Sequence, residues 1–195
     1  MVLRRPRQPM RPRQSAIPLL IALIFVVGAM IYLSRMSYLP QPAKMSIAPS
    51  ERAGPADIYP IAAITPGATN PAITQANIDE TICNPHWSTK SIRPPEEYTY
   101  RLKREQIGEY HDSDTRAADY EEDHLIPLEL GGNPRDPKNL WPEPYSASIA
   151  DGGAKYKDKV EAYLHSEVCS SAMPLAEAQR RIATDWYRVY ATSVR

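Results

Sequence analysis

An acid and a histidine stand side by side at Asp123-His124, and their chemistry suits hydrolysis of a phosphodiester. Such a reaction needs a deprotonated water and a way to neutralise charge on the phosphate. An imidazole with an ordinary pKa of about 6.5 accepts a proton at neutral pH, so His124 is the candidate general base. The carboxylate of Asp123 is a hard oxygen ligand for a divalent metal ion, which polarises a phosphate and stabilises the departing oxygen.

The segment 121–144 predicts a hairpin that positions this pair. Leu125–Leu130 predicts a strand, the glycine-rich run 131–134 a turn, and Asn139–Trp141 a returning strand that Pro142 ends. Neighbouring residues on an ideal strand face opposite sides, so Asp123 and His124 must lie at a strand end or a bend to share a site. Taken alone, the pair is more often a half-buried histidine beside a turn carboxylate.

Apolar residues at helical spacing predict helices on both sides of this hairpin. They cover Tyr98–Tyr110, Ala154–Val168 and a last helix that opens at Pro174, a good first-turn proline. A short β-like stretch is expected at Thr81–Cys83, and Trp141 is expected in the core. Together these elements predict an α+β domain.

The hairpin residues also carry a family resemblance. The ordered set Asp123-His124, Pro127, Gly131-Gly132 and Asn139-Leu140, followed by a helix, resembles the ββα-metal core of the HNH endonucleases. Over residues 69–195 the chain is similar to small exported HNH-type proteins. That wider match rests on Asn70-Pro71, Thr81-Ile82-Cys83, Arg93-Pro94-Pro95, Lys157-Asp158, Glu161, Ala178-Gln179 and Asp185-Trp186.

The resemblance implies a metal-dependent endonuclease with one divalent ion, which could be Mg, Mn, Zn or Ni. It also implies that Asn139 orients the imidazole of His124. The third residue of the HNH set, usually a His or Asn on the following helix, is missing at its usual distance, where Ala147, Ser148 and Ile149 stand. The candidate replacements lie on the helix that follows. Lys157 could contact the scissile phosphate, and Asp158 could be a metal ligand. A solvated helix face explains both equally well.

Charge limits the expected binding of nucleic acid. Residues 67–195 carry fifteen basic groups against twenty-one acidic ones, a formal charge of −6. Binding to a polyanion draws most of its affinity from Lys and Arg. Arg135 and Lys138 on the hairpin turn are candidate phosphate contacts. We therefore expect weak, salt-sensitive and sequence-nonspecific binding of DNA or RNA.

The two cysteines, Cys83 and Cys169, allow two interpretations. Outside the cytosol they would form a disulfide that closes a long loop, and the resemblance places the cysteines as well. The alternative is a zinc site, because Cys83-x-x-His86 and His165-x-x-x-Cys169 have zinc-ligand spacing. The disulfide is favoured.

The N-terminal third predicts an address outside the cytosol. Five arginines lie in the cytoplasmic segment 1–14, and an apolar run over residues 15–33 is long enough, as a helix, to cross a bilayer of about 30 Å. The charge asymmetry places the N-terminus in the cytosol and the remaining chain in the periplasm or at the cell surface. A cleaved signal peptide, giving a secreted protein, is the alternative. Residues 34–66 are proline-rich and predict a linker, followed by the domain at 67–195.

Three functions remain open. The first is a membrane-anchored endonuclease that acts on DNA or RNA. The second is a binding module for nucleic acid or protein on the same fold that has lost catalysis, consistent with the missing third residue. The third is a zinc-stapled structural module without nuclease activity. Oligomeric state, substrate and metal identity do not follow from the sequence.

Overall fold

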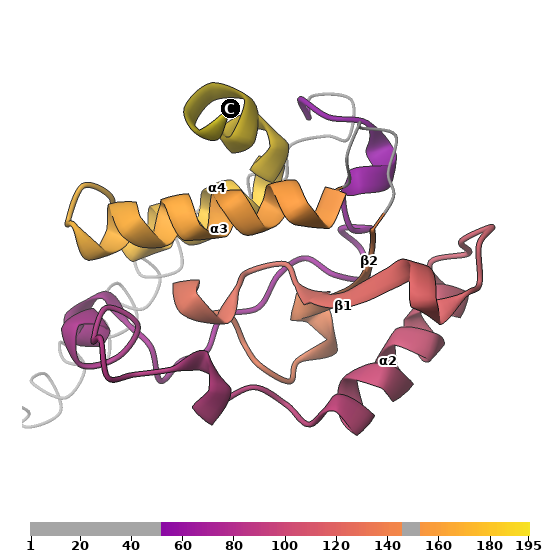
Figure 1. Cartoon of the computed structure of the whole chain (residues 1–195), viewed down its shortest axis with the longest axis horizontal. Helices are drawn as coiled ribbons and strands as arrows, with labels where there is room; N and C mark the ends of the chain where they lie inside the picture. Colours follow the sequence, from indigo (N-terminus) through magenta and orange to yellow (C-terminus); the bar gives the residue numbers. More distant parts are fainter. Residues whose placement is uncertain (1–51, 146–152) are drawn as a thin grey trace, which may run out of the picture. The chain divides into compact units, whose positions relative to one another are not determined.

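The computed structural model describes residues 52–145 and 153–195, which form an α+β unit as expected (Figure 1). The expected segments 1–14 and 15–33 and most of the linker lie outside the described residues. Within the described part, no helix is both long and apolar enough to cross a membrane. The regular elements are α2 (Glu96–Glu109), β1 (Tyr120–His124), β2 (Leu140–Pro144), α3 (Gly153–Cys169) and α4 (Leu175–Val189).

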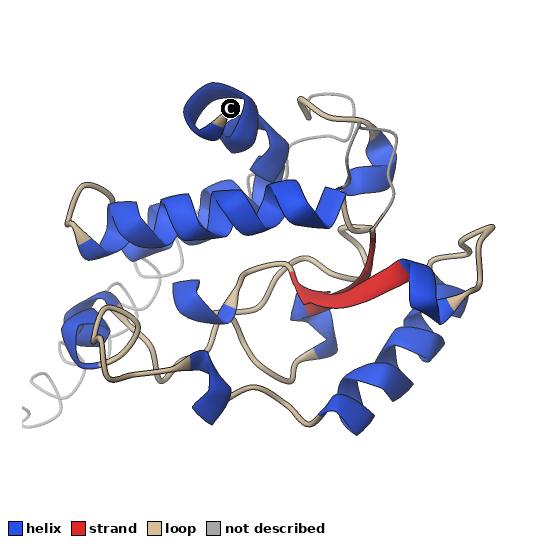
Figure 2. Cartoon of the chain, in the orientation of Figure 1, coloured by secondary structure: helices blue, strands red, loops and turns tan. Residues whose placement is uncertain are grey.

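Short helical turns connect these elements (Figure 2). The 3₁₀ turns cover Ala56–Ile58, Gln75–Glu80, Thr89–Ser91, Ala117–Asp119, Leu128–Leu130 and Pro137–Asn139, and a π-helical turn at Tyr190–Val194 closes the chain. The β-like stretch expected at Thr81–Cys83 is wrong. It is a turn, in which the backbone N–H groups of Thr81 and Cys83 donate to the Ile78 carbonyl.

The two strands form an antiparallel hairpin in which Asp123 pairs with Trp141 and His124 with Leu140. The strand expected at Leu125–Leu130 is wrong, because β1 ends at His124 and the chain then turns through Pro127. Gly132 makes this turn possible: a Cβ on it would lie 1.7 Å from the Ile126 carbonyl oxygen.

The returning strand is confirmed, but Pro142 lies inside it. The Leu140 carbonyl accepts from Thr65 Oγ1 at 3.2 Å and Gln106 Nε2 at 2.7 Å, so it points away from β1. Backbone groups alternate in direction along a strand, so the nitrogen of Pro142, two residues further, points to the same outer side as the Leu140 carbonyl. No hydrogen bond to β1 is lost there, which is why the strand accepts a proline.

Two of the helices contact this hairpin, and α4 packs on α3. In Figure 1, α2 packs against both strands, α3 contacts β2, and α3 and α4 lie side by side. The two C-terminal helices occur where their apolar spacing predicts them. Their inward residues are fully buried and form much of the core: Val160, Leu164, Val168, Ala178, Ile182 and Trp186. Trp141 is buried as expected.

The packed unit begins before the expected boundary at residue 67. Ile58 and Tyr59 are buried in the core. The indole Nε1 of Trp186 donates to the Ile58 carbonyl at 3.0 Å, and the Tyr59 hydroxyl donates to Asp185 Oδ1 at 2.5 Å. The end of the predicted linker is therefore part of the domain. Ile58 and Tyr59 supply apolar surface that packs against α4.

Candidate functional site

Asp123 and His124 occupy the end of β1, the position that allows neighbours to share a site. His124 is 6 % exposed, and its Nε2 lies 3.1 Å from the Pro134 carbonyl oxygen. A carbonyl only accepts, so this contact places the hydrogen on Nε2 and leaves the lone pair on Nδ1. In the neutral ring, Nδ1 is therefore the nitrogen that can accept a hydrogen bond or a proton.

Burial keeps this imidazole neutral. It lowers the pKa of His124, and the positive charges of Lys157 and Arg93 lower it further, whereas Asp123 and the contact with Pro134 raise it. The net shift is downward. At neutral pH the ring is therefore mostly uncharged, and its second nitrogen keeps its lone pair.

The amide of Asn139 hydrogen-bonds to the backbone of the turn and not to the imidazole of His124. Its Oδ1 accepts from the backbone N–H groups of Ala68 and Ile126, and its Nδ2 donates to the carbonyls of Ile126 and Asn133. The amide fixes the turn next to Pro134, whose carbonyl holds His124. Asn139 is a positioning residue that acts through this turn.

Lys157 is buried rather than presented to a phosphate. It is 1 % exposed, and its Nζ donates to Asp123 Oδ2 at 2.5 Å, to Glu161 Oε1 at 2.5 Å and to the His124 carbonyl at 3.0 Å. The ammonium therefore ties α3 to the end of β1. The direct phosphate contact expected of Lys157 does not fit this position.

The carboxyl groups around this ammonium differ in charge. Burial would raise the pKa of Asp123, but the charge and hydrogen bond of Lys157 outweigh it, and that pKa is lowered. Burial raises the pKa of Glu161 to about 8, and it raises that of Glu143, which shares a hydrogen bond with Asp123, well above its usual range. Burial also opposes the charge of Lys157, but the acidic neighbours raise its pKa. The cluster thus holds an ammonium opposite an ionised Asp123.

The remaining predicted site residues lie on the surface nearby. Asp158 is exposed on α3, and its pKa is raised by partial burial and by the charge of Asp123. Arg135 and Lys138 are exposed on the turn that carries Pro134. The hydroxyl of Tyr98 on α2 donates to the Arg135 carbonyl at 2.6 Å and holds this turn.

Arg93 and Glu161 are parts of the site to which the sequence analysis gave no role. Arg93 is exposed, and its charge acts on both His124 and Glu121, so it lies within electrostatic range of the hairpin. The spacing of Lys157 and Glu161, one helical turn apart, was a visible signal for an ion pair. Nothing in the sequence signals that Arg93 approaches His124.

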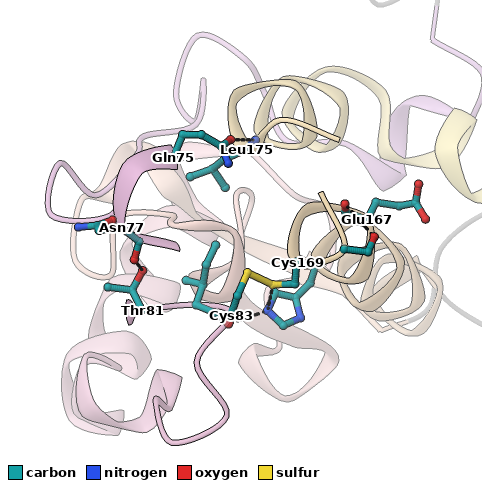
Figure 3. The surroundings of a disulfide bond; sticks show 10 residues. Gln75, Asn77, Thr81, Cys83, Glu167, Cys169 and Leu175 are labelled. Atoms are coloured by element: carbon teal, nitrogen blue, oxygen red, sulfur yellow. Dashed lines mark hydrogen bonds between the residues drawn. A yellow bond between two sulfur atoms is a disulfide. The ribbon is translucent and has the colours of Figure 1, made fainter. Parts of the chain in front are cut away.

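Cys83 and Cys169 form the expected disulfide, which joins the turn after residue 80 to α3 (Figure 3). His165 lies against it, with Nε2 2.8 Å from the Ile82 carbonyl oxygen and 3.4 Å from Cys169 Sγ. The donor atoms of Cys83, His165 and Cys169 lie within 4.8 Å of one another, and this Cys-His-Cys group could bind a metal ion. His86, the other predicted zinc ligand, is exposed and is not part of the group.

Comparisons with family models, curated proteins and solved structures give no match to this chain.

Proposed function

We propose that the chain hydrolyses phosphodiester bonds in DNA or RNA, with His124 as the general base. The orientation of the imidazole is the observation that carries the proposal. Its Nε2–H is held by Pro134, its pKa is lowered by burial, and Nδ1 retains a lone pair at neutral pH.

The reaction that these residues support is hydrolysis by an activated water. Nδ1 of His124 takes a proton from water, the water oxygen forms a bond to phosphorus, and the bond from phosphorus to the sugar oxygen breaks. The departing oxygen takes a proton from solvent. Three exposed cations are proposed to hold the phosphate. The charge of Arg93 acts on His124, and Arg135 and Lys138 lie on the turn that carries Pro134.

The expected divalent ion does not fit beside Asp123 in this arrangement. Lys157 already donates to Asp123 Oδ2 and to Glu161, so an added cation would meet a buried ammonium at short range. None of the steps above is assigned to a metal ion. An ion bound to Asp123 and Asp158 requires that Lys157 leave Asp123, and the metal requirement of the activity distinguishes the two arrangements.

The ion pair between Lys157 and Asp123 favours a second function, a binding module on this fold without catalysis. A lysine that permanently neutralises Asp123 stabilises the hairpin against α3 but provides no Lewis acid for a phosphate. Under either function, we propose that residues 15–33 anchor the domain outside the cytosol, as the sequence predicts.

Cleavage of plasmid DNA and of RNA by the full chain in mild detergent tests the proposal. The reactions contain Mg²⁺, Mn²⁺, Ni²⁺, Zn²⁺ or a chelator, and compare the wild type with His124→Ala and with His86→Ala, a change at an exposed histidine. We expect His124→Ala to lose about 10²–10⁴ in rate, the usual contribution of a general base, and His86→Ala to match the wild type.

Equal cleavage by His124→Ala and the wild type would remove His124 from the mechanism. Absence of cleavage by the wild type with every ion and with the chelator would favour the binding module. Circular dichroism of each variant checks that the fold is retained.

A further inference from the structure

Three side chains of the types that bind metal ions converge outside the hairpin site, at the C-terminal end of α3. His165 and Cys169 are one helical turn apart on α3, so both point from the same face of the helix. Cys83 reaches this face from the turn after residue 80, and Figure 3 shows the two labelled cysteines meeting between that turn and the helix. All three donor atoms lie within 4.8 Å of one another.

This donor set has the composition of a zinc site. Zinc prefers thiolate sulfur and imidazole nitrogen, and two Cys with one His form a known ligand set that leaves a fourth position for water. Among the described residues, no fourth His, Cys, Asp or Glu belongs to this group. His165 and both cysteines are half-buried, so the group lies at the edge of the core and not at its centre.

We propose that Cys83, His165 and Cys169 form a zinc site in the reduced protein, and that the disulfide and the zinc ion replace one another. Sulfur atoms bonded in a disulfide are not thiolates and do not hold zinc. A thiol or phosphine reductant supplies two electrons, the S–S bond breaks, and two thiols form with two protons from solvent. Zinc then binds both sulfurs as thiolates and releases those two protons.

His165 changes its hydrogen bonding in this exchange. In the disulfide form its Nε2 carries the hydrogen and donates to the Ile82 carbonyl at 2.8 Å. Binding of zinc through Nε2 requires the other tautomer, with the hydrogen on Nδ1. Zinc binding would break the hydrogen bond from His165 to the Ile82 carbonyl. Ile82 directly precedes Cys83, so this bond already places the imidazole beside Cys83 in the disulfide form.

Both forms tie the same two points of the chain. The disulfide closes a loop with a sequence separation of 86 residues. A zinc ion held by both sulfurs and His165 closes the same loop by coordination, so the turn stays attached to α3 when the compartment becomes reducing. The domain would therefore keep its fold during a change in redox conditions.

Cobalt binding to the untagged full chain in mild detergent tests this inference. Co²⁺ reports thiolate ligands through a charge-transfer absorption, and added Zn²⁺ bleaches it. The reduced wild type, prepared with a phosphine reductant, is compared with the oxidised wild type, Cys83→Ser, His165→Ala and His86→Ala, the last as a matched histidine control.

The reduced wild type is expected to bind about one ion per chain with the thiolate absorption. The oxidised chain should show none, and Cys83→Ser a weaker one. His165→Ala should weaken zinc affinity at least about tenfold, because even indirect partners of a metal contribute that much, while His86→Ala leaves it unchanged. The readout does not depend on nuclease activity, and an ion near Asp123 would bind regardless of redox state and without this absorption.

Two results would overturn the inference. One is a reduced wild type that shows no more thiolate absorption than the oxidised chain. The other is a His165→Ala variant that binds zinc as tightly as the wild type. Circular dichroism before and after zinc addition covers the case of a reduced chain that unfolds, since the proposal then requires zinc to restore the helices.

Discussion

Replacing Lys157 with methionine removes the ammonium that Asp123 and Glu161 share while keeping much of the volume of the side chain. Lys157 is 1 % exposed, and its three acceptors lie within 3.0 Å, so no solvent replaces the lost donor. Removing one partner of a buried ion pair costs about 3–5 kcal/mol. The loss of stability should depend on pH, because the group that loses its partner is the titratable carboxylate of Asp123.

The dependence follows from Asp123. In the wild type the pKa of Asp123 is lowered and that of Lys157 is raised, so the pair is charged and its contribution constant between pH 5 and 7. In the variant, the charge of Lys157 no longer opposes burial, so the pKa of Asp123 rises above its unfolded value of about 3.9. The cost grows with pH, up to limits of about 1.5 kcal/mol at pH 5 and about 4 kcal/mol at pH 7 for a carboxyl that keeps its proton. Glu161 adds little, because its pKa is already about 8.

Urea unfolding of the full chain at pH 7 and pH 5, followed by tryptophan fluorescence, measures both values. Lys155→Met is the matched control on the same helix, since Lys155 is exposed and the change should cost less than about 0.5 kcal/mol. Adding Asp123→Asn to Lys157→Met should recover part of the loss. A loss below about 1 kcal/mol at pH 7, or equal losses at the two pH values, would refute the buried ion pair.

Four further outcomes are expected. Asn139→Ala leaves buried backbone groups of the turn unpaired, at about 1–3 kcal/mol each, and should lower the free energy of unfolding by about 3 kcal/mol or more; a loss below 1 kcal/mol contradicts this role. Tyr59→Phe should cost about 1.5–3 kcal/mol for a hydrogen bond to a carboxylate, whereas Tyr100→Phe, at an exposed tyrosine, should cost almost nothing in the same urea titration. Because a base must be neutral and the pKa of His124 is lowered, the pH–rate profile of cleavage should lose activity only below about pH 6.5; half-loss at higher pH contradicts the burial argument. Reducing the disulfide in metal-free buffer should lower the free energy of unfolding by about 4–5 kcal/mol in a chain-entropy model, measured by thermal melting with and without reductant.

The helices were predictable because apolar residues recur at the helical period. Val160, Leu164 and Val168 on α3, and Ile182 and Trp186 on α4, are all fully buried. Nothing beyond local spacing was needed to find these faces, since each helix buries a continuous stripe against the other.

The strand before the turn was not predictable in the same way. Its sequence, from Tyr120 to His124, holds three consecutive carboxylates, while the apolar run that follows it suggested a strand at Leu125–Leu130. Tertiary contacts with α2 and α3 decide the outcome, and Pro127 with the short turn after it ends the extended backbone. Side-chain burial from distant elements overrides the local pattern.

The candidate site also has a part that the sequence predicts and a part that it does not. The position of Asp123 and His124 at a strand end follows from the two residues being neighbours. The ammonium between Asp123 and Glu161 does not, because it comes from a helix 34 residues away from Asp123. Lysine is rarely buried without partners, and its partners here are brought together only by the packing of α3 on the hairpin.

The prolines of β2 also determine how this domain behaves beside other copies of itself. Pro142 and Pro144 are at alternate positions with Leu140, so both turn toward the outer edge of the sheet, where neither has a hydrogen to donate. On the opposite edge, Lys103 Nζ caps the Tyr120 carbonyl at 2.8 Å. A strand from a second molecule would meet missing donors on one side and an engaged acceptor on the other. Both features oppose the addition of a further strand and so disfavour edge-to-edge aggregation at high local concentration.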